Sequence, residues 1–143
     1  HIARFDARPA VLRRCERRAI QILRALSDPA GLQDELAEDL THNLGKPRAA
    51  QCLAGFADFL ALVSRQGWRA ADICAPGTTG YTTDEIALAQ LIFDATEQRR
   101  DKALIDASFL VAPKGLLPLL TAATRAGLPL LCEECRARIR GRV

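Results

Sequence analysis

The sequence predicts an all-α fold: a single-domain bundle of about six helices over residues 1–143, with one longer loop near residues 67–81. Apolar side chains recur at intervals of three and four residues along nearly the whole chain, which is the pattern of helices that bury one face. The length of 143 residues suits one domain of ordinary size. Apolar residues make up 49% of the chain and charged residues 26%, which supports a packed core and argues against a disordered or low-complexity protein.

Proline and glycine positions divide the first part of the chain into two helices. The first is expected to begin at Pro9, because proline is favoured in the first turn of a helix, and its apolar positions continue to Leu26. The segment Ser27–Pro29 is a start signal for the second helix. Gly45 marks the expected end of that helix, because glycine commonly follows the last helical turn.

A third helix is expected to begin at Pro47 and to form the centre of the core, because it carries the widest apolar stripe in the chain. Gly55 lies within this stripe and costs about 1 kcal/mol of helix propensity relative to alanine. We therefore expect another helix to cross close to this glycine. The stripe consists of Cys52, Leu53, Phe56, Phe59, Leu60 and Val63.

The helical pattern stops over Gly67–Tyr81, and the turn-forming segment Ala75–Gly80 is the clearest loop in the sequence. The apolar side chains of this loop are expected to hold it in place. They are Trp68, Ile73 and Tyr81.

A capping box begins the next helix. Thr82 is followed three residues later by Glu85. The hydroxyl of Thr82 can accept a hydrogen bond from the backbone N–H of Glu85, and the carboxylate of Glu85 can accept one from the backbone N–H of Thr82. The helix is expected to continue towards Arg99 and Arg100. Asp101 is the expected cap of a short helix that follows.

The last third of the chain contains at least one more helix. Residues 108–112 have the pattern of a helix end or of a short buried strand, which periodicity does not separate. Residues 116–126 are expected to form a helix that ends at Gly127. Pro129 is expected to begin a final helix that continues towards Arg140.

Arginine is concentrated on one face of the first helix. At 100° per residue, Arg13, Arg14, Arg17 and Arg24 lie opposite the apolar side chains. Such a face suits carboxylates, whether of neighbouring helices or of a partner, and also phosphates. No aromatic residues are interleaved with these arginines, which argues against single-stranded nucleic acid. A second basic element is the C-terminal tail, with Arg136, Arg138, Arg140 and Arg142.

Five cysteines, together with an arginine-rich rather than apolar beginning, predict free thiols in a reducing cytoplasm. Cys132 and Cys135 form a C-x-x-C pair whose sulfurs share one face of a helix. Zinc usually needs four ligands, and the other candidate ligands are scattered, so we expect no metal site. Inert thiols, redox chemistry and metal binding are the three interpretations of this pair.

The second helix carries carboxylates and a histidine on one face: Glu35, Glu38, Asp39 and His42. This spacing is half of a di-iron site, but no second helix offers another carboxylate and histidine. We therefore expect a solvated acidic face, with the arginine face of the first helix as its candidate partner. The sequence contains no nucleophile elbow and no phosphate-binding loop. We assign no catalytic residue and no cofactor, and the sequence favours a non-enzymatic protein.

No uninterrupted apolar run reaches the roughly 20 residues of a membrane span, so we expect no membrane interaction. The leading hypothesis is a cytoplasmic interaction or regulatory module that binds a protein partner, or a second copy of itself, through charged helical faces. The alternative is a regulator that binds nucleic acid through the arginine face of the first helix and the arginine-rich tail. A second alternative is a thiol or metal protein that uses Cys132 and Cys135.

Overall fold

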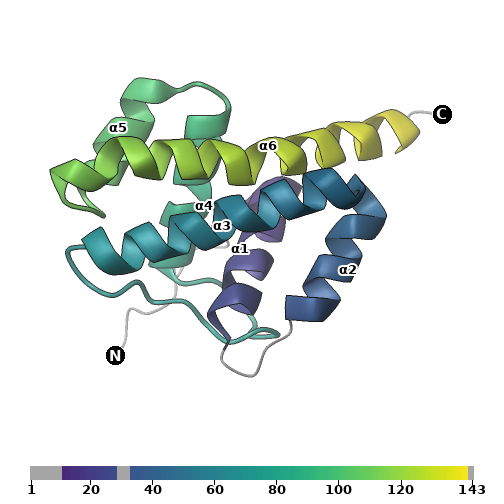
Figure 1. The fold of residues 1–143 in the computed structure, drawn as a ribbon, viewed down its shortest axis with the longest axis horizontal. Coiled ribbons are helices and arrows are strands. Elements are labelled where there is room, and N and C mark those ends of the chain that lie inside the picture. The colour runs from purple at the N-terminus through teal and green to yellow at the C-terminus, as the bar shows by residue number, and fades with distance from the viewer. Residues whose placement is uncertain (1–10, 29–32, 142–143) are drawn as a thin grey trace.

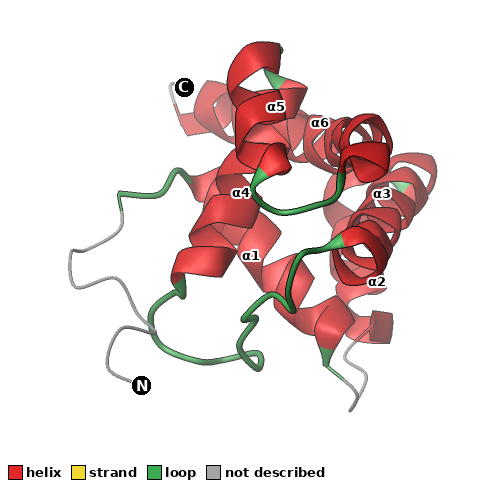
Figure 2. Ribbon diagram, turned by 90° about the vertical axis from the view of Figure 1, so that its left-hand side faces the viewer, coloured by secondary structure: helices red, strands yellow, loops and turns green. Residues whose placement is uncertain are grey.

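The fold is a helical bundle. The structure, a computed structural model, describes residues 11–28 and 33–141, with side chains for 11–28 and 34–133. Figure 2 shows helices and loops and no strand among these residues, which confirms the predicted all-α class. The elements are α1 (Arg14–Ser27), α2 (Gln33–Leu44), α3 (Lys46–Gln66), α4 (Thr83–Thr96), α5 (Arg100–Ser108), the 3-10 helix η1 (Pro113–Gly115) and α6 (Leu116–Gly141).

The two longest helices, α3 and α6, lie side by side and run in opposite directions along one face of the molecule (Figure 1). Helix α4 packs on the inner side of α6 and also contacts α1 and α5. Helix α2 packs on α3 close to the start of that helix. The core therefore lies between the α3–α6 pair and the α1–α4 layer.

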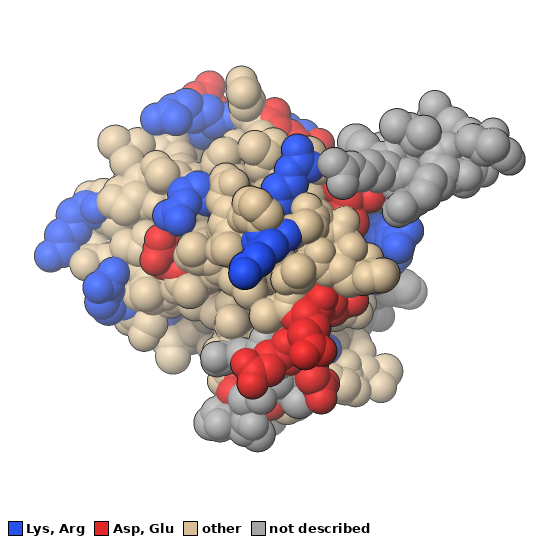
Figure 3. All heavy atoms as spheres, turned by 45° about the vertical axis from the view of Figure 1, so that its right-hand side comes forward, with Lys and Arg blue, Asp and Glu red and all other residues tan. Residues whose placement is uncertain are grey.

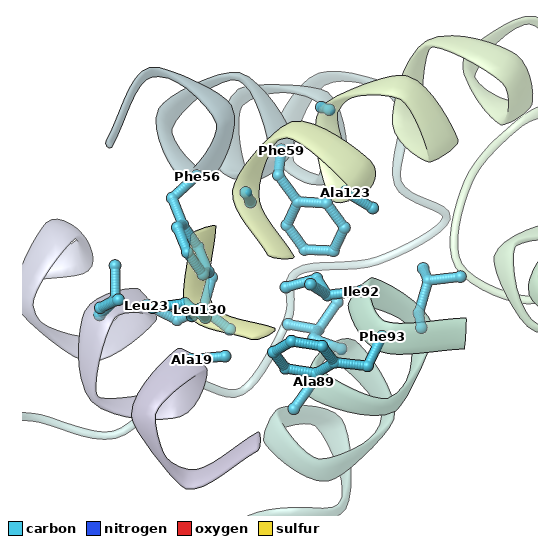
Figure 4. Packing of buried hydrophobic residues seen from close by; sticks show 14 of the residues in the cluster. Ala19, Leu23, Phe56, Phe59, Ala89, Ile92, Phe93, Ala123 and Leu130 are labelled. Carbon is cyan, nitrogen blue, oxygen red and sulfur yellow. The ribbon is translucent and has the colours of Figure 1, made fainter. Parts of the chain in front are cut away.

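Aromatic rings from α3 and α4 fill this core. Phe56 and Phe59 of α3 and Phe93 of α4 have no exposed surface, and Figure 4 shows them in one cluster with Leu23 of α1 and Leu130 of α6. The apolar stripe predicted on the third helix accounts for this arrangement. Its four core positions are Cys52, Phe56, Phe59 and Val63, whereas Leu53 and Leu60 are half-buried at its edges.

Glycine allows α6 to approach both of its neighbours closely. A Cβ atom at Gly55 of α3 would lie 2.6 Å from the backbone nitrogen of Ala126, which confirms the expected close crossing. On the other side, a Cβ atom at Gly127 would lie 2.2 Å from Oγ1 of Thr96 in α4. Small residues of α6 thus bring its backbone against α3 and α4 at the same level.

The predicted break in the last helix is wrong, because α6 continues through Gly127 and Pro129 to Gly141. Gly127 is a packing residue against Thr96 rather than a helix end. Pro129 removes one backbone donor from the helix. The helix continues because Ala126 and Leu130, on either side of this interruption, are both buried in the core.

Several predicted helix boundaries also shift. Helix α1 begins at Arg14, and the expected start at Pro9 lies outside the described residues, as does the start signal at Pro29. Helix α4 ends at Thr96, before the expected Arg99 and Arg100, because Gln98 has a positive φ of 62° that interrupts helical geometry.

The segment that follows α4 differs in detail from the prediction. Arg99, not Asp101, occupies the position before α5, and its side chain makes no capping hydrogen bond. The ambiguous residues 108–112 form the end of α5, a turn, and a single antiparallel bridge between Val111 and Gly67.

The predicted loop connects α3 to α4, and the predicted capping box begins α4. The backbone N–H of Glu85 donates to Oγ1 of Thr82 at 3.0 Å, and the N–H of Thr82 donates to Oε1 of Glu85 at 2.9 Å. Ile73 and Tyr81 pack against the core as expected. Trp68 has 61% of its surface exposed, but its indole N–H donates to the carbonyl oxygen of Ser108 and so also holds the loop in place.

One segment of the described chain, Pro113–Glu133, has the length and the mean hydropathy (1.4) of a membrane-crossing helix. Half of this segment is buried against the other helices. A helix that packs in a protein core has the same apolar composition as a membrane-crossing helix.

The α3–α6 crossing leads to a stability prediction for Gly55→Ala. Alanine at this helical position would raise helix propensity by about 1 kcal/mol, but its Cβ atom would clash with the backbone of Ala126. We expect the clash to dominate and to lower the free energy of unfolding by about 1–3 kcal/mol in urea titrations. The matched control is Ala54→Ser, an exposed neighbour on the same helix, which should change stability by less than about 1 kcal/mol. A more stable Gly55→Ala variant would contradict the close crossing.

Candidate functional site

The arginines predicted to form one face of the first helix have different environments in the structure. Arg24 is buried, with only 6% of its side chain exposed, and its guanidinium forms a two-point ion pair with Glu85 of α4. The two distances are 2.6 Å from Nε to Oε2 and 2.8 Å from Nη2 to Oε1. Arg24 is therefore a structural residue and is not available for an external anion.

The same guanidinium holds the loop between α3 and α4. Arg24 donates to the backbone carbonyls of Thr78 at 2.8 Å and of Gly80 at 2.6 Å, and it lies over the ring of Tyr81. Burial by itself raises the pKa of Glu85. Hydrogen bonds from Arg24 and from the backbone N–H groups of Thr82 and Cys74 outweigh burial and lower that pKa below its ordinary value of 4.5. The ion pair thus stays charged inside the protein.

Arg13 also has an internal partner. Its guanidinium makes two hydrogen bonds to the carboxylate of Glu97 beyond the end of α4, at 2.6 and 3.1 Å, and it lies over the ring of Phe93. Arg17 is exposed and donates to the carbonyl oxygen of Leu12. Arg14 is exposed as well. Only Arg14 and Arg17 of the four predicted residues thus remain on an open surface without a carboxylate partner among the described residues.

A second group of charges joins α4 to α5. Asp94 is buried and accepts hydrogen bonds from Arg99 at 2.7 Å and from Lys102 at 2.6 Å. Burial raises the pKa of Asp94, but these two cations more than compensate and lower it. The positive side chains that follow α4 therefore neutralise its buried carboxylate.

The acidic face predicted on the second helix is solvated. Figure 3 shows carboxylates gathered over α2, next to a surface on which basic and neutral side chains are mixed. Asp39 pairs with Arg18 of α1, an arginine outside the predicted face, and no described carboxylate of α2 pairs with Arg13, Arg14, Arg17 or Arg24. Arg18 also lies 3.5 Å from Glu133 of α6. The exposed residues of this face include Asp34, Glu35, Glu38 and His42.

The cysteines of the described chain show no metal-binding arrangement. Within the residues whose side chains are described, no three His, Cys, Asp or Glu side chains come together to hold an ion. Cys132 is a half-buried free thiol on α6, and the side chain of its predicted partner Cys135 lies outside the described part. Burial raises the pKa of the Cys52 thiol to about 12, and this thiol contacts the carbonyl oxygen of Ala126 at 3.4 Å. Cys52 is therefore a core residue.

An apolar patch is formed by three exposed side chains: Trp68, which follows α3, and Ile105 and Phe109 at the end of α5. Figure 1 shows where these two helices end. These side chains have 61%, 59% and 77% of their surface exposed. The indole N–H of Trp68 donates to the carbonyl oxygen of Ser108 at 3.1 Å, and its backbone N–H donates to Leu110. Both hydrogen bonds hold the tryptophan against the end of α5, beside Phe109.

Sequence reasoning did not identify this patch. The sequence predicts only that Trp68 helps to hold its loop in place, and the residues 105–109 have the pattern of an ordinary helix end. The only sequence signal was the interruption of the helical pattern at Gly67, which marks the loop but not the direction of its side chains.

Comparison of the chain with protein-family models, with curated proteins and with solved structures found no match.

The buried ion pair leads to a mutational prediction. Glu85→Gln leaves the Arg24 charge buried without a carboxylate, and we expect the free energy of unfolding to fall by about 3–5 kcal/mol. The double variant Arg24→Met/Glu85→Gln should lose less than the sum of the two single variants, as a double-mutant cycle in urea measures. The control is Arg125→Met, which removes an exposed pair with Asp58 and should cost about 0–1 kcal/mol. Equal losses in Glu85→Gln and the control would contradict a structural role for the pair.

The lowered carboxylate pKa values lead to a prediction about acid. The pKa values of Asp84, Glu85, Asp94 and Glu97 are all below their ordinary values of 3.8 for Asp and 4.5 for Glu, each because of arginine or lysine partners. An acid with a lower pKa in the folded state stabilises the fold above the unfolded-state pKa and loses that effect as the pH falls. Urea titrations should therefore show stability that decreases as the pH drops through 4.5 and 3.8.

The control for this pH dependence replaces the exposed α2 carboxylates Asp34, Glu35 and Glu38 by their amides. This variant should keep the acid dependence of the wild type, because these groups lie on the solvated face. A wild-type stability that stays constant or rises on acidification would contradict the assignment.

Proposed function

We propose that this protein is an interaction module that binds a protein partner through the apolar patch of Trp68, Ile105 and Phe109. The observation that carries this proposal is the exposure of three large apolar side chains at one place. The described helices bury a large apolar core without these side chains. Tryptophan and phenylalanine that are exposed together are typical of the centres of protein interfaces.

The structure favours this patch over the predicted arginine face as the interaction surface. Arg24 and Arg13 use their charges inside the fold, so the face retains only Arg14 and Arg17. The apolar patch, in contrast, has no internal partner for most of its surface. A partner protein that covers the patch would remove apolar surface from water, and this is the dominant favourable contribution to association.

The charges beside the patch indicate the chemistry of the partner. Arg65 and Lys114 are exposed, and neither pairs with a carboxylate among the described residues. They belong to the same end of the molecule, because η1 packs against Gln66 through Gly115. The partner is therefore expected to present an apolar segment that covers Trp68 and Phe109, with carboxylates that face these two cations.

The proposal is tested with a displayed library of random peptides of about 12 residues, selected on the wild-type protein. We expect enriched peptides that combine Leu, Ile or Phe with Asp or Glu. Trp68→Ser and Phe109→Ser should each weaken binding of the selected peptides at least tenfold in fluorescence anisotropy, since interface aromatics commonly contribute about 2 kcal/mol or more. Both side chains are exposed, so these variants should unfold at nearly the wild-type urea concentration.

The matched control is Gln90→Ser, an exposed position on α4, which should leave peptide binding unchanged. Arg65→Glu with Lys114→Glu should shift selection away from acidic peptides. Peptides that bind the Phe109→Ser variant as well as the wild type would contradict the proposed surface. Sedimentation equilibrium of the protein alone distinguishes self-association from binding of a different protein. If the protein is a dimer and Phe109→Ser makes it a monomer, the patch binds a second copy instead of a partner.

A further inference from the structure

A groove lies on a different side of α6 from the α3 contact, between the end of α4, the first turn of α5 and the outer residues of α6. It has a volume of about 750 Å³, which is within the usual range of sites for small molecules. None of the three residues of the apolar patch lines it. The groove is therefore a separate feature from the proposed protein-binding surface.

The floor of the groove is apolar. It is formed by Ala95 of α4, Ala103 of α5 and Leu120 of α6, with Leu117 exposed at its edge. The threonine hydroxyls in the wall donate to carbonyl oxygens of their own helix. Thr121 donates to Leu117 at 3.1 Å, and Thr124 donates to Leu120 at 3.0 Å. The groove thus offers an apolar surface to a ligand, and its hydroxyl donors are already used.

The charged residues that line the groove are both arginines. Arg100 is exposed in the first turn of α5 and has no ion-pair partner among the described residues. Arg125 of α6 contacts Asp58 of α3 at 2.8 Å, but both side chains of that pair are exposed, so the pair is weak. No carboxylate lines the groove, so its two cations favour an anion.

We propose that this groove binds a small amphipathic carboxylate, a molecule with an apolar chain and one carboxylate group. The chain lies on Ala95, Ala103 and Leu120, where it is removed from water. The carboxylate lies between Arg100 and Arg125, whose planar guanidinium groups match the geometry of a carboxylate. Neither feature alone selects such a ligand, because a short acid lacks the chain and an alcohol lacks the charge.

The test uses decanoate as the probe, titrated calorimetrically into the full chain. We expect one site with a Kd of about 10–300 µM, as for good ligands of this size. Acetate should not bind measurably, and decanol should bind at least tenfold more weakly than decanoate. In a ¹⁵N-labelled protein, decanoate should shift the amide resonances of Ala103 and Leu120 more than those of the apolar patch.

The decisive variant is Arg100→Glu, which reverses one charge of the groove. It should weaken decanoate binding at least tenfold without harming the fold, because a carboxylate is favourable in the first turn of a helix. The matched control is Arg48→Glu, since Arg48 is exposed in the first turn of α3 and lines neither this groove nor the neighbouring one. This variant should bind decanoate like the wild type.

Three results would overturn the proposal: no decanoate binding, equal binding to Arg100→Glu, or decanol binding as tight as that of decanoate. A loss of binding in the Arg48→Glu control as large as in Arg100→Glu would also overturn it, because it would indicate a general charge effect. The result is independent of the peptide experiment, since Phe109→Ser should leave decanoate binding intact.

Discussion

The arrangement of this protein depends on the buried ion pair between Arg24 of α1 and Glu85 of α4. The carboxylate of Glu85 also accepts hydrogen bonds from the backbone of Thr82 and Cys74, and the guanidinium of Arg24 reaches two carbonyl oxygens of the α3–α4 loop. One pair of side chains therefore joins α1, the start of α4 and the loop between α3 and α4. Because a buried charge without its partner is unfavourable, these three segments hold one another in place.

The close approach of α6 to its neighbours is the second constraint, and it sets the shape of the surface. Gly55 and Gly127 remove side chains from both contacts, so the α6 backbone lies against α3 on one side and α4 on the other. The outward-facing residues Leu117, Thr121 and Arg125 of α6 line two grooves. One lies between α6 and α3, and the other lies between α6 and the end of α4 with α5. The groove proposed to bind a carboxylate is thus a consequence of tight packing beneath it.

Several cations of the described residues pair with carboxylates of the same fold. Arg13, Arg24, Arg99 and Lys102 each neutralise a carboxylate of α4 or of the residue that follows it. What remains for recognition is an apolar patch at the ends of α3 and α5 and a groove with two arginines. Both proposals rest on these surfaces, and neither needs the predicted arginine face as a whole.

The sequence by itself determined the helical class, the core stripe of the third helix, the capping box at Thr82 and the close crossing at Gly55. These features follow from spacing, capping chemistry and glycine, all of which act within a few residues. Only the tertiary structure decided that Arg24 is buried while Arg17 is exposed, that Trp68 faces outward, and that α6 continues through Pro129. A helical wheel places an arginine opposite the core of its own helix, but the partners of Arg24 come from the end of the α3–α4 loop and from Glu85 in the first turn of α4. Contacts between segments so distant in the chain depend on how the helices pack, and residue spacing within one helix does not predict that packing.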